Sequence, residues 1–94
     1  MKVQRKPTTA GGTLVFEFDV KGQEFTVKNF SNGRIYVSDK TPVVEDESIL
    51  IPALSGQDIT MGNRNAFGLT AVSTLYVKAE AENTFGVEVQ VLSW

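Results

Sequence analysis

The chain has 94 residues, of which 41% are hydrophobic and 21% charged, with a net charge of −2; this composition is typical of one soluble globular domain. The absence of cysteine and histidine excludes disulfides, thiolate chemistry and imidazole ligands, so a metal site would need oxygen ligands alone. The negative charge argues against a nucleic-acid partner, and no apolar run is long enough to span a membrane.

The first twelve residues differ from the rest of the chain. They contain a proline, two threonines and a Gly-Gly pair without apolar periodicity, so we expect residues 1–12 to form a flexible arm. Three basic residues of this arm, Lys2, Arg5 and Lys6, would be solvated or would dock on an acidic surface of a partner. Residues 13–94 are expected to form a single domain.

Alternation of apolar and polar residues predicts a half-buried strand over residues 13–20, a two-residue hairpin turn at positions 21–22 and a second strand over residues 23–29. A Ser-Asn-Gly turn then leads into a strand over residues 34–39, which contains the triplet Ile35-Tyr36-Val37. The two aliphatic side chains of this triplet should point into a core, and the tyrosine should point away from it.

The second half of the chain continues this pattern. An acidic loop at residues 45–47 precedes short strands at 48–52 and 57–61, an irregular segment at 63–73, a strand at 74–80 and a closing strand at 85–91. The strand at 74–80 contains a second triplet, Leu75-Tyr76-Val77, and in the closing strand Phe85 alternates in phase with three valines. Seven to eight short strands separated by turn residues predict an all-β sandwich or small barrel.

No residue constellation favours catalysis. A Ser38–Lys40 pair is conceivable, but serine and lysine are common at strand ends, and paired carboxylates would need a deep cleft for which 94 residues leave little room. The acidic run at 45–47 lacks the spacing of a calcium loop, so we expect no catalytic residue, metal or cofactor. The alternation does not place four aromatic residues in the core: Tyr36, Phe67, Tyr76 and Trp94. They would cap the ends of the sandwich, form an oligomer interface or stack on a ligand. Arg64, in the irregular segment, is a further candidate contact.

Four segments together resemble a group of small phage virion proteins, which includes head-decoration, head-fibre and tail-accessory domains. They read VKNFSNGRIYV at residues 27–37, IPALSGQDIT at 51–60, TLYV at 74–77 and GVEVQVLSW at 86–94. One departure from the family pattern is that Pro52 and Gly56 stand three residues apart, where the pattern more often has them adjacent. This difference alters the turn that would be presented there.

The resemblance implies a non-enzymatic structural protein that binds a capsid or tail surface, often as a trimer. We therefore expect an antiparallel β-sandwich of jelly-roll type that is assembled in the host cytoplasm and incorporated into the virion. Its partners would be phage structural proteins and further copies of this chain. The alternative is a carbohydrate-binding module for host recognition, with Tyr36, Phe67, Tyr76 or Trp94 stacking on sugar.

Overall fold

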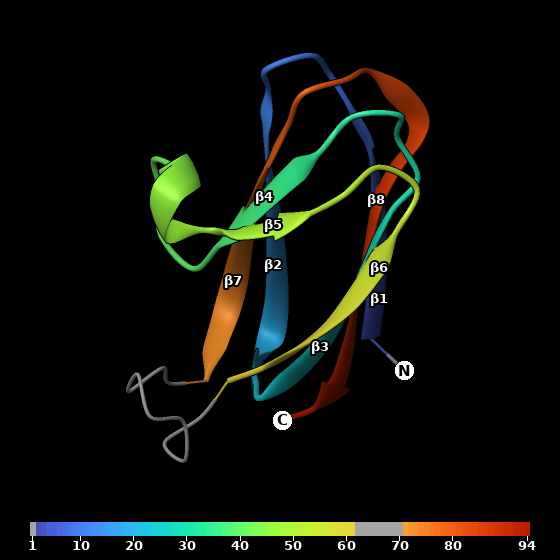
Figure 1. Ribbon diagram of the computed structural model, residues 1–94. Helices are drawn as coiled ribbons and strands as arrows, with labels where there is room; N and C mark the ends of the chain where they lie inside the picture. Colours follow the sequence, from blue (N-terminus) through green and yellow to red (C-terminus); the bar gives the residue numbers. More distant parts are fainter. Residues whose placement is uncertain (1, 62–70) are drawn as a thin grey trace.

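The computed structural model describes residues 2–61 and 71–94, which form eight strands and one short turn of 3-10 helix (Figure 1). In chain order these are β1 (Lys2–Thr8), β2 (Thr13–Gly22), β3 (Glu24–Asn29), β4 (Ile35–Ser38), η1 (Glu45–Glu47), β5 (Ile49–Ile51), β6 (Gly56–Thr60), β7 (Val72–Ala79) and β8 (Asn83–Ser93). Among the described residues, no helix is long and apolar enough to cross a membrane.

The strands form two four-stranded antiparallel sheets, in the orders β1-β8-β3-β6 and β2-β7-β4-β5. Strands equally far from the two ends of the chain pair with each other: β1 with β8, β2 with β7, β3 with β6 and β4 with β5. Further pairs, β8 with β3 and β7 with β4, complete each sheet. The chain therefore passes from one sheet to the other at every connection except that between β4 and β5.

This topology corrects the predicted hairpin at positions 21–22. Lys21 and Gly22 are the last two residues of β2, the chain bends at Gln23, and β2 and β3 belong to different sheets and do not pair. The connection between β7 and β8 likewise crosses between the sheets. A glycine turn favours a tight reversal of the chain, but the pairing of each strand depends on partners that are far away in the sequence.

The two sheets share one hydrophobic core, as in a sandwich. Its members come from both sheets and are almost completely buried: Phe16, Phe18, Phe25, Val27, Ile35, Val37, Ile51, Ile59, Met61, Leu75, Val77, Ala79, Val87, Val89 and Val91. Burial of each large side chain in this set contributes about 1.5–3 kcal/mol. The aliphatic residues of both triplets lie in this core, which confirms the inward direction predicted from their alternation.

The prediction of a flexible arm is wrong for most of residues 1–12, because Lys2–Thr8 forms strand β1 and pairs with β8. The strand alternates half-buried Lys2, Gln4 and Lys6 with exposed residues. The half-buried positions of this strand are polar and the only large aliphatic residue of the strand, Val3, is exposed, so a search for apolar alternation could not detect it. At the end of the strand, the hydroxyl of Thr8 donates a hydrogen bond to the carbonyl of Ala81 over 2.8 Å.

The closing strand contains a bulge at Gly86, which has a φ of +63°. The register of the β1–β8 pair shifts between Lys6 and Thr8, opposite this glycine, and Pro7 there has no N–H to donate. Between the pairings of Lys6 and Thr8, β1 advances two residues and β8 advances four, and in this irregular stretch Val87 is buried whereas Phe85 is 63% exposed. The predicted in-phase alternation of Phe85 with the three valines is therefore broken at its first member.

Candidate functional site

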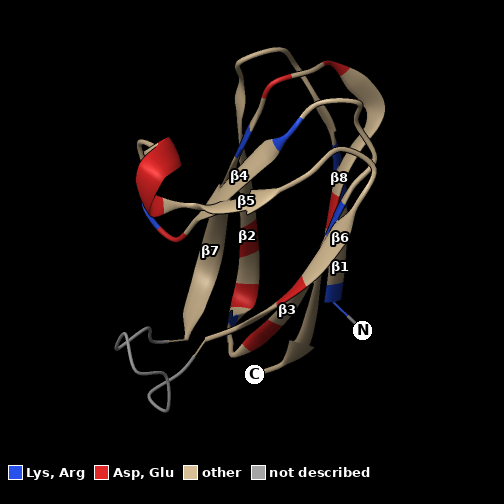
Figure 2. Cartoon of the chain, in the orientation of Figure 1, with Lys and Arg blue, Asp and Glu red and all other residues tan. Residues whose placement is uncertain are grey.

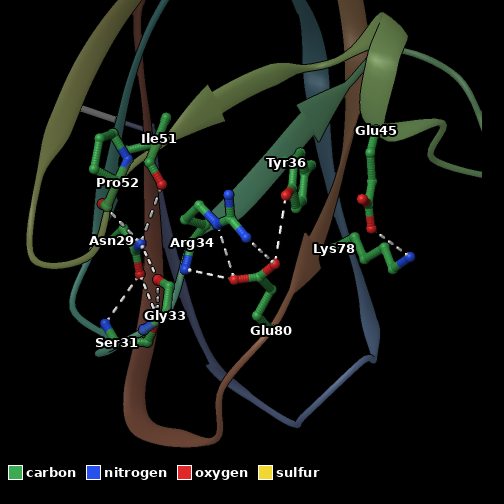
Figure 3. A network of polar contacts seen from close by, with 10 residues as sticks. All are labelled: Asn29, Ser31, Gly33, Arg34, Tyr36, Glu45, Ile51, Pro52, Lys78 and Glu80. Carbon is green, nitrogen blue, oxygen red and sulfur yellow. Dashed lines mark hydrogen bonds and ion pairs between the residues drawn. The ribbon is translucent and has the colours of Figure 1, made fainter.

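Two connections at one end of the sandwich are held together by a buried side chain, Asn29 (Figure 3). Only 2% of Asn29 is exposed. Its amide nitrogen donates to the carbonyl oxygens of Gly33 at 2.9 Å and Pro52 at 3.0 Å, and its amide oxygen accepts from the hydroxyl of Ser31 at 2.7 Å. The β3–β4 and β5–β6 connections are consequently fixed to each other, since a buried network of this kind has a single favourable geometry.

The β5–β6 connection presents Leu54 in an unusual backbone conformation. Its φ is +57°, the left-handed region that costs a residue with a Cβ atom about 1–2 kcal/mol. The backbone N–H of Leu54 donates to the carbonyl of Ser31 over 3.1 Å, which holds it in place. Its side chain is 69% exposed, so this turn holds a large apolar group out toward solvent.

Leu54 lies beside an open hollow of about 290 Å³, which is also lined by Phe30 and Lys28. The backbone N–H of Phe30 donates to the carbonyl of Gly86 over 2.9 Å, and the residue before Gly86 is the exposed Phe85. Phe30, Leu54 and Phe85 therefore lie at the same end of the sandwich, and we call them the loop-end patch. The sequence does not predict this patch. Phe85 alternates in phase with the core valines, and no sequence pattern indicates the positive φ of Leu54.

The two predicted tyrosines lie on the outer face of the second sheet, on the adjacent strands β4 and β7. Tyr36 is opposite Lys78 and Leu50, whereas Tyr76 is opposite Val15. The ring of Tyr36 is nevertheless only 5% exposed, so it is covered within this chain. Tyr76 is half-buried.

An ion pair at the edge of this face fixes the ring of Tyr36 (Figure 3). The guanidinium of Arg34 binds the carboxylate of Glu80 with two N–H groups, at 3.1 and 3.2 Å, and the hydroxyl of Tyr36 donates to the same carboxylate over 3.4 Å. Donation by Arg34 lowers the pKa of Glu80, and burial raises the pKa of Tyr36. These groups have a structural explanation that requires no ligand.

The three basic residues of the predicted arm do not form one patch. Lys2 and Lys6 point from β1 toward β2, where Lys2 pairs with Asp19 at 2.8 Å and Lys6 donates to the carbonyl of Val15. Arg5 lies on the opposite face of β1, 3.8 Å from the carboxylate of Glu88. Side chains from β1 thus reach across to the edge strand β2 of the other sheet, where they bind the carbonyl of Val15 and the carboxylate of Asp19.

The remaining predicted contacts are separated from these. Trp94 is 57% exposed, and the ammonium of Lys2 lies 5.7 Å from the centre of its ring. Arg64 and Phe67 lie outside the described residues. The structure therefore brings Lys2 and Trp94 together, whereas Tyr36 and Tyr76 share the outer face of two adjacent strands and the hydroxyl of Tyr36 bonds to Glu80.

The residues considered above for catalysis and calcium binding make ordinary structural contacts. The hydroxyl of Ser38 accepts a hydrogen bond from the backbone N–H of Lys40, as in a simple turn. Glu45 pairs with Lys78 at 3.0 Å, and in residues 2–61 and 71–94 no three acidic side chains gather closely enough to hold a metal ion. Comparison with known protein families, with curated proteins and with solved structures found no match to this chain.

Proposed function

We propose that this chain is a jelly-roll protein with a structural role in a phage particle, where it binds a capsid or tail surface and is not an enzyme. The observation that carries the proposal is the strand order. In a jelly roll, one long antiparallel hairpin is rolled up so that its two arms are distributed over two sheets. Pairing of β1 with β8, β2 with β7, β3 with β6 and β4 with β5 supports this topology. Jelly rolls are frequent among viral capsid domains and lectins.

The resemblance of four segments to small phage virion proteins favours the virion over other settings of this topology. We propose that copies of the chain associate, with a trimer favoured, and that the loop-end patch contributes to the contact. Leu54 and Phe85 are the two most exposed large apolar residues among those that the structure describes. Exposed apolar side chains held by a rigid scaffold are typical of protein–protein contacts, because the backbone that carries them loses little conformational entropy on binding.

Self-association is tested by light scattering coupled to size-exclusion chromatography. We expect the wild-type chain to have about three times the monomer mass of 10.3 kDa. The double variant Leu54→Asn/Phe85→Ser should elute as a monomer, because it lacks both apolar contacts. Val15→Thr is the matched control, because Val15 is an exposed apolar residue on strand β2, away from the loop-end patch. This variant should remain a trimer. A wild-type chain that is monomeric at all concentrations, or a double variant that still forms trimers, would contradict this part of the proposal.

Incorporation into a particle is tested separately. Phage particles are induced from cells that carry the gene, banded on a density gradient and analysed by mass spectrometry. We expect peptides of this chain in the particle band, in amounts comparable with other accessory proteins. Recovery only from the unassembled fraction would overturn the assignment to a virion.

A further inference from the structure

A groove opens on the side of the sandwich where β1 and β2 diverge. It has a volume of about 380 Å³, which lies within the range of small-molecule sites, and Val3 and Phe18 supply the apolar part of its lining. The other residues that line it are polar or charged: Lys2, Gln4, Glu17 and Asp19. Figure 2 shows basic positions on β1 and acidic positions on β2. Apolar and polar groups therefore meet in one open site.

The polar groups of the groove are held in position by contacts between the two strands. The amide nitrogen of Gln4 donates to the carbonyl of Glu17 over 2.6 Å. The amide oxygen of Gln4 takes no part in this hydrogen bond and can accept one from a ligand. Lys2 binds Asp19 at 2.8 Å and lowers the pKa of its carboxyl group, so this side chain stays ionised. A ligand in the groove would thus meet fixed acceptors and one ammonium donor.

An aromatic platform lies next to these groups. The ammonium of Lys2 contacts Asp19 and also lies over the ring of Trp94, which places the indole near the Lys2 end of the groove. More than half of the surface of Trp94 is open to solvent. An exposed aromatic ring close to the Lys2–Asp19 pair is suited to a ligand that has one C–H-rich face and several hydroxyl donors.

The charges of the groove decide between ligand classes. The lining carries one cation, Lys2, and two anions, Glu17 and Asp19. A cationic ligand over Trp94 would meet the ammonium of Lys2, and an anionic one would meet both carboxylates. A neutral ligand with many hydroxyl groups is repelled neither by the ammonium of Lys2 nor by the two carboxylates.

We propose that the β1–β2 groove and Trp94 form a binding site for a neutral saccharide, with the ring stacked on Trp94 and hydroxyl groups donating to Asp19, Glu17 and Gln4. The site is independent of the loop-end patch. Phe85 and Trp94 lie nine residues apart along β8, which corresponds to roughly 30 Å at the rise of an extended strand. Saccharide binding and self-association can therefore succeed or fail separately.

The chain contains a single tryptophan, so its fluorescence reports directly on the proposed site. The full chain is titrated with glucose, galactose, mannose and N-acetylglucosamine, and with free arginine as a cationic competitor. We expect a saturable change in emission with at least one neutral sugar, at millimolar concentrations, and none with arginine. The absence of a saturable change with all four sugars, or saturation by arginine instead, would overturn the proposal.

Variants test which residues are involved. Asp19→Ala and Gln4→Ala should each weaken sugar binding at least tenfold, whereas Glu82→Ala, an exposed carboxylate on the β7–β8 connection, is the matched control and should leave binding unchanged. Circular dichroism establishes that each variant is folded. The Leu54→Asn/Phe85→Ser variant should retain full sugar binding even as a monomer. Equal affinity of Asp19→Ala, Gln4→Ala and the wild-type chain would place the sugar elsewhere and refute the assignment.

Discussion

Substitution of Gly86 by alanine tests whether the bulge in β8 requires a glycine. A Cβ atom at this position would lie 2.0 Å from the carbonyl oxygen of Lys6 and 2.7 Å from the Cα atom of Pro7. Both are backbone atoms of β1, so they cannot move aside by a change of rotamer. The φ of +63° adds the cost of a left-handed alanine, about 1–2 kcal/mol, and displacement of packed backbone typically adds about 1–3 kcal/mol. We expect Gly86→Ala to lower the free energy of unfolding by about 2–5 kcal/mol.

The matched control is Gly11→Ala, because Gly11 also has a positive φ, +76°, but no atom lies within 4 Å of the position of its Cβ. The free energy of unfolding of Gly11→Ala should fall only by the cost of a left-handed alanine, about 1–2 kcal/mol. Urea unfolding followed by circular dichroism measures both variants. Equal losses for the two glycines would show that the backbone of β1 does not exclude a side chain at position 86.

Three further outcomes are expected. Asn29→Ala should lower the free energy of unfolding in urea by about 2–4 kcal/mol, because it leaves buried partners without hydrogen bonds; a loss like that of a surface residue would contradict this. The pKa of Glu80 is lowered in the folded state, so its contribution to stability is present above the ordinary value of 4.5 and is lost as the pH falls through the folded-state value. As the pH is lowered, the free energy of unfolding should therefore decrease less steeply for Glu80→Gln than for the wild type. Parallel curves for the two proteins would refute this. In protein dilute enough to be monomeric, Leu54→Asn should raise the melting temperature, with a gain of about 1 kcal/mol, because asparagine tolerates a positive φ better than leucine. A lower melting temperature of the monomer would show that Leu54 is not strained.

The candidate surfaces could be anticipated from the sequence only in part. Alternation correctly directed the tyrosines of both triplets away from the core. It could not show that Tyr36 would be covered within its own chain, since that depends on Arg34 and Glu80, which are 46 residues apart. The strained conformation of Leu54 also has no local signature, because the turn is held by hydrogen bonds from the β3–β4 connection.

The sequence by itself determined the all-β class, most of the strands and the direction of the core side chains. These properties follow from the period of two along each strand, which is a local property of the chain. The tertiary structure decided the pairing of the strands, the inclusion of residues 2–8 as β1 and the exposure of Phe85. Each of these depends on backbone hydrogen bonds and steric contacts between residues far apart in the sequence, as where Gly86 meets the backbone of β1 some eighty residues earlier in the chain.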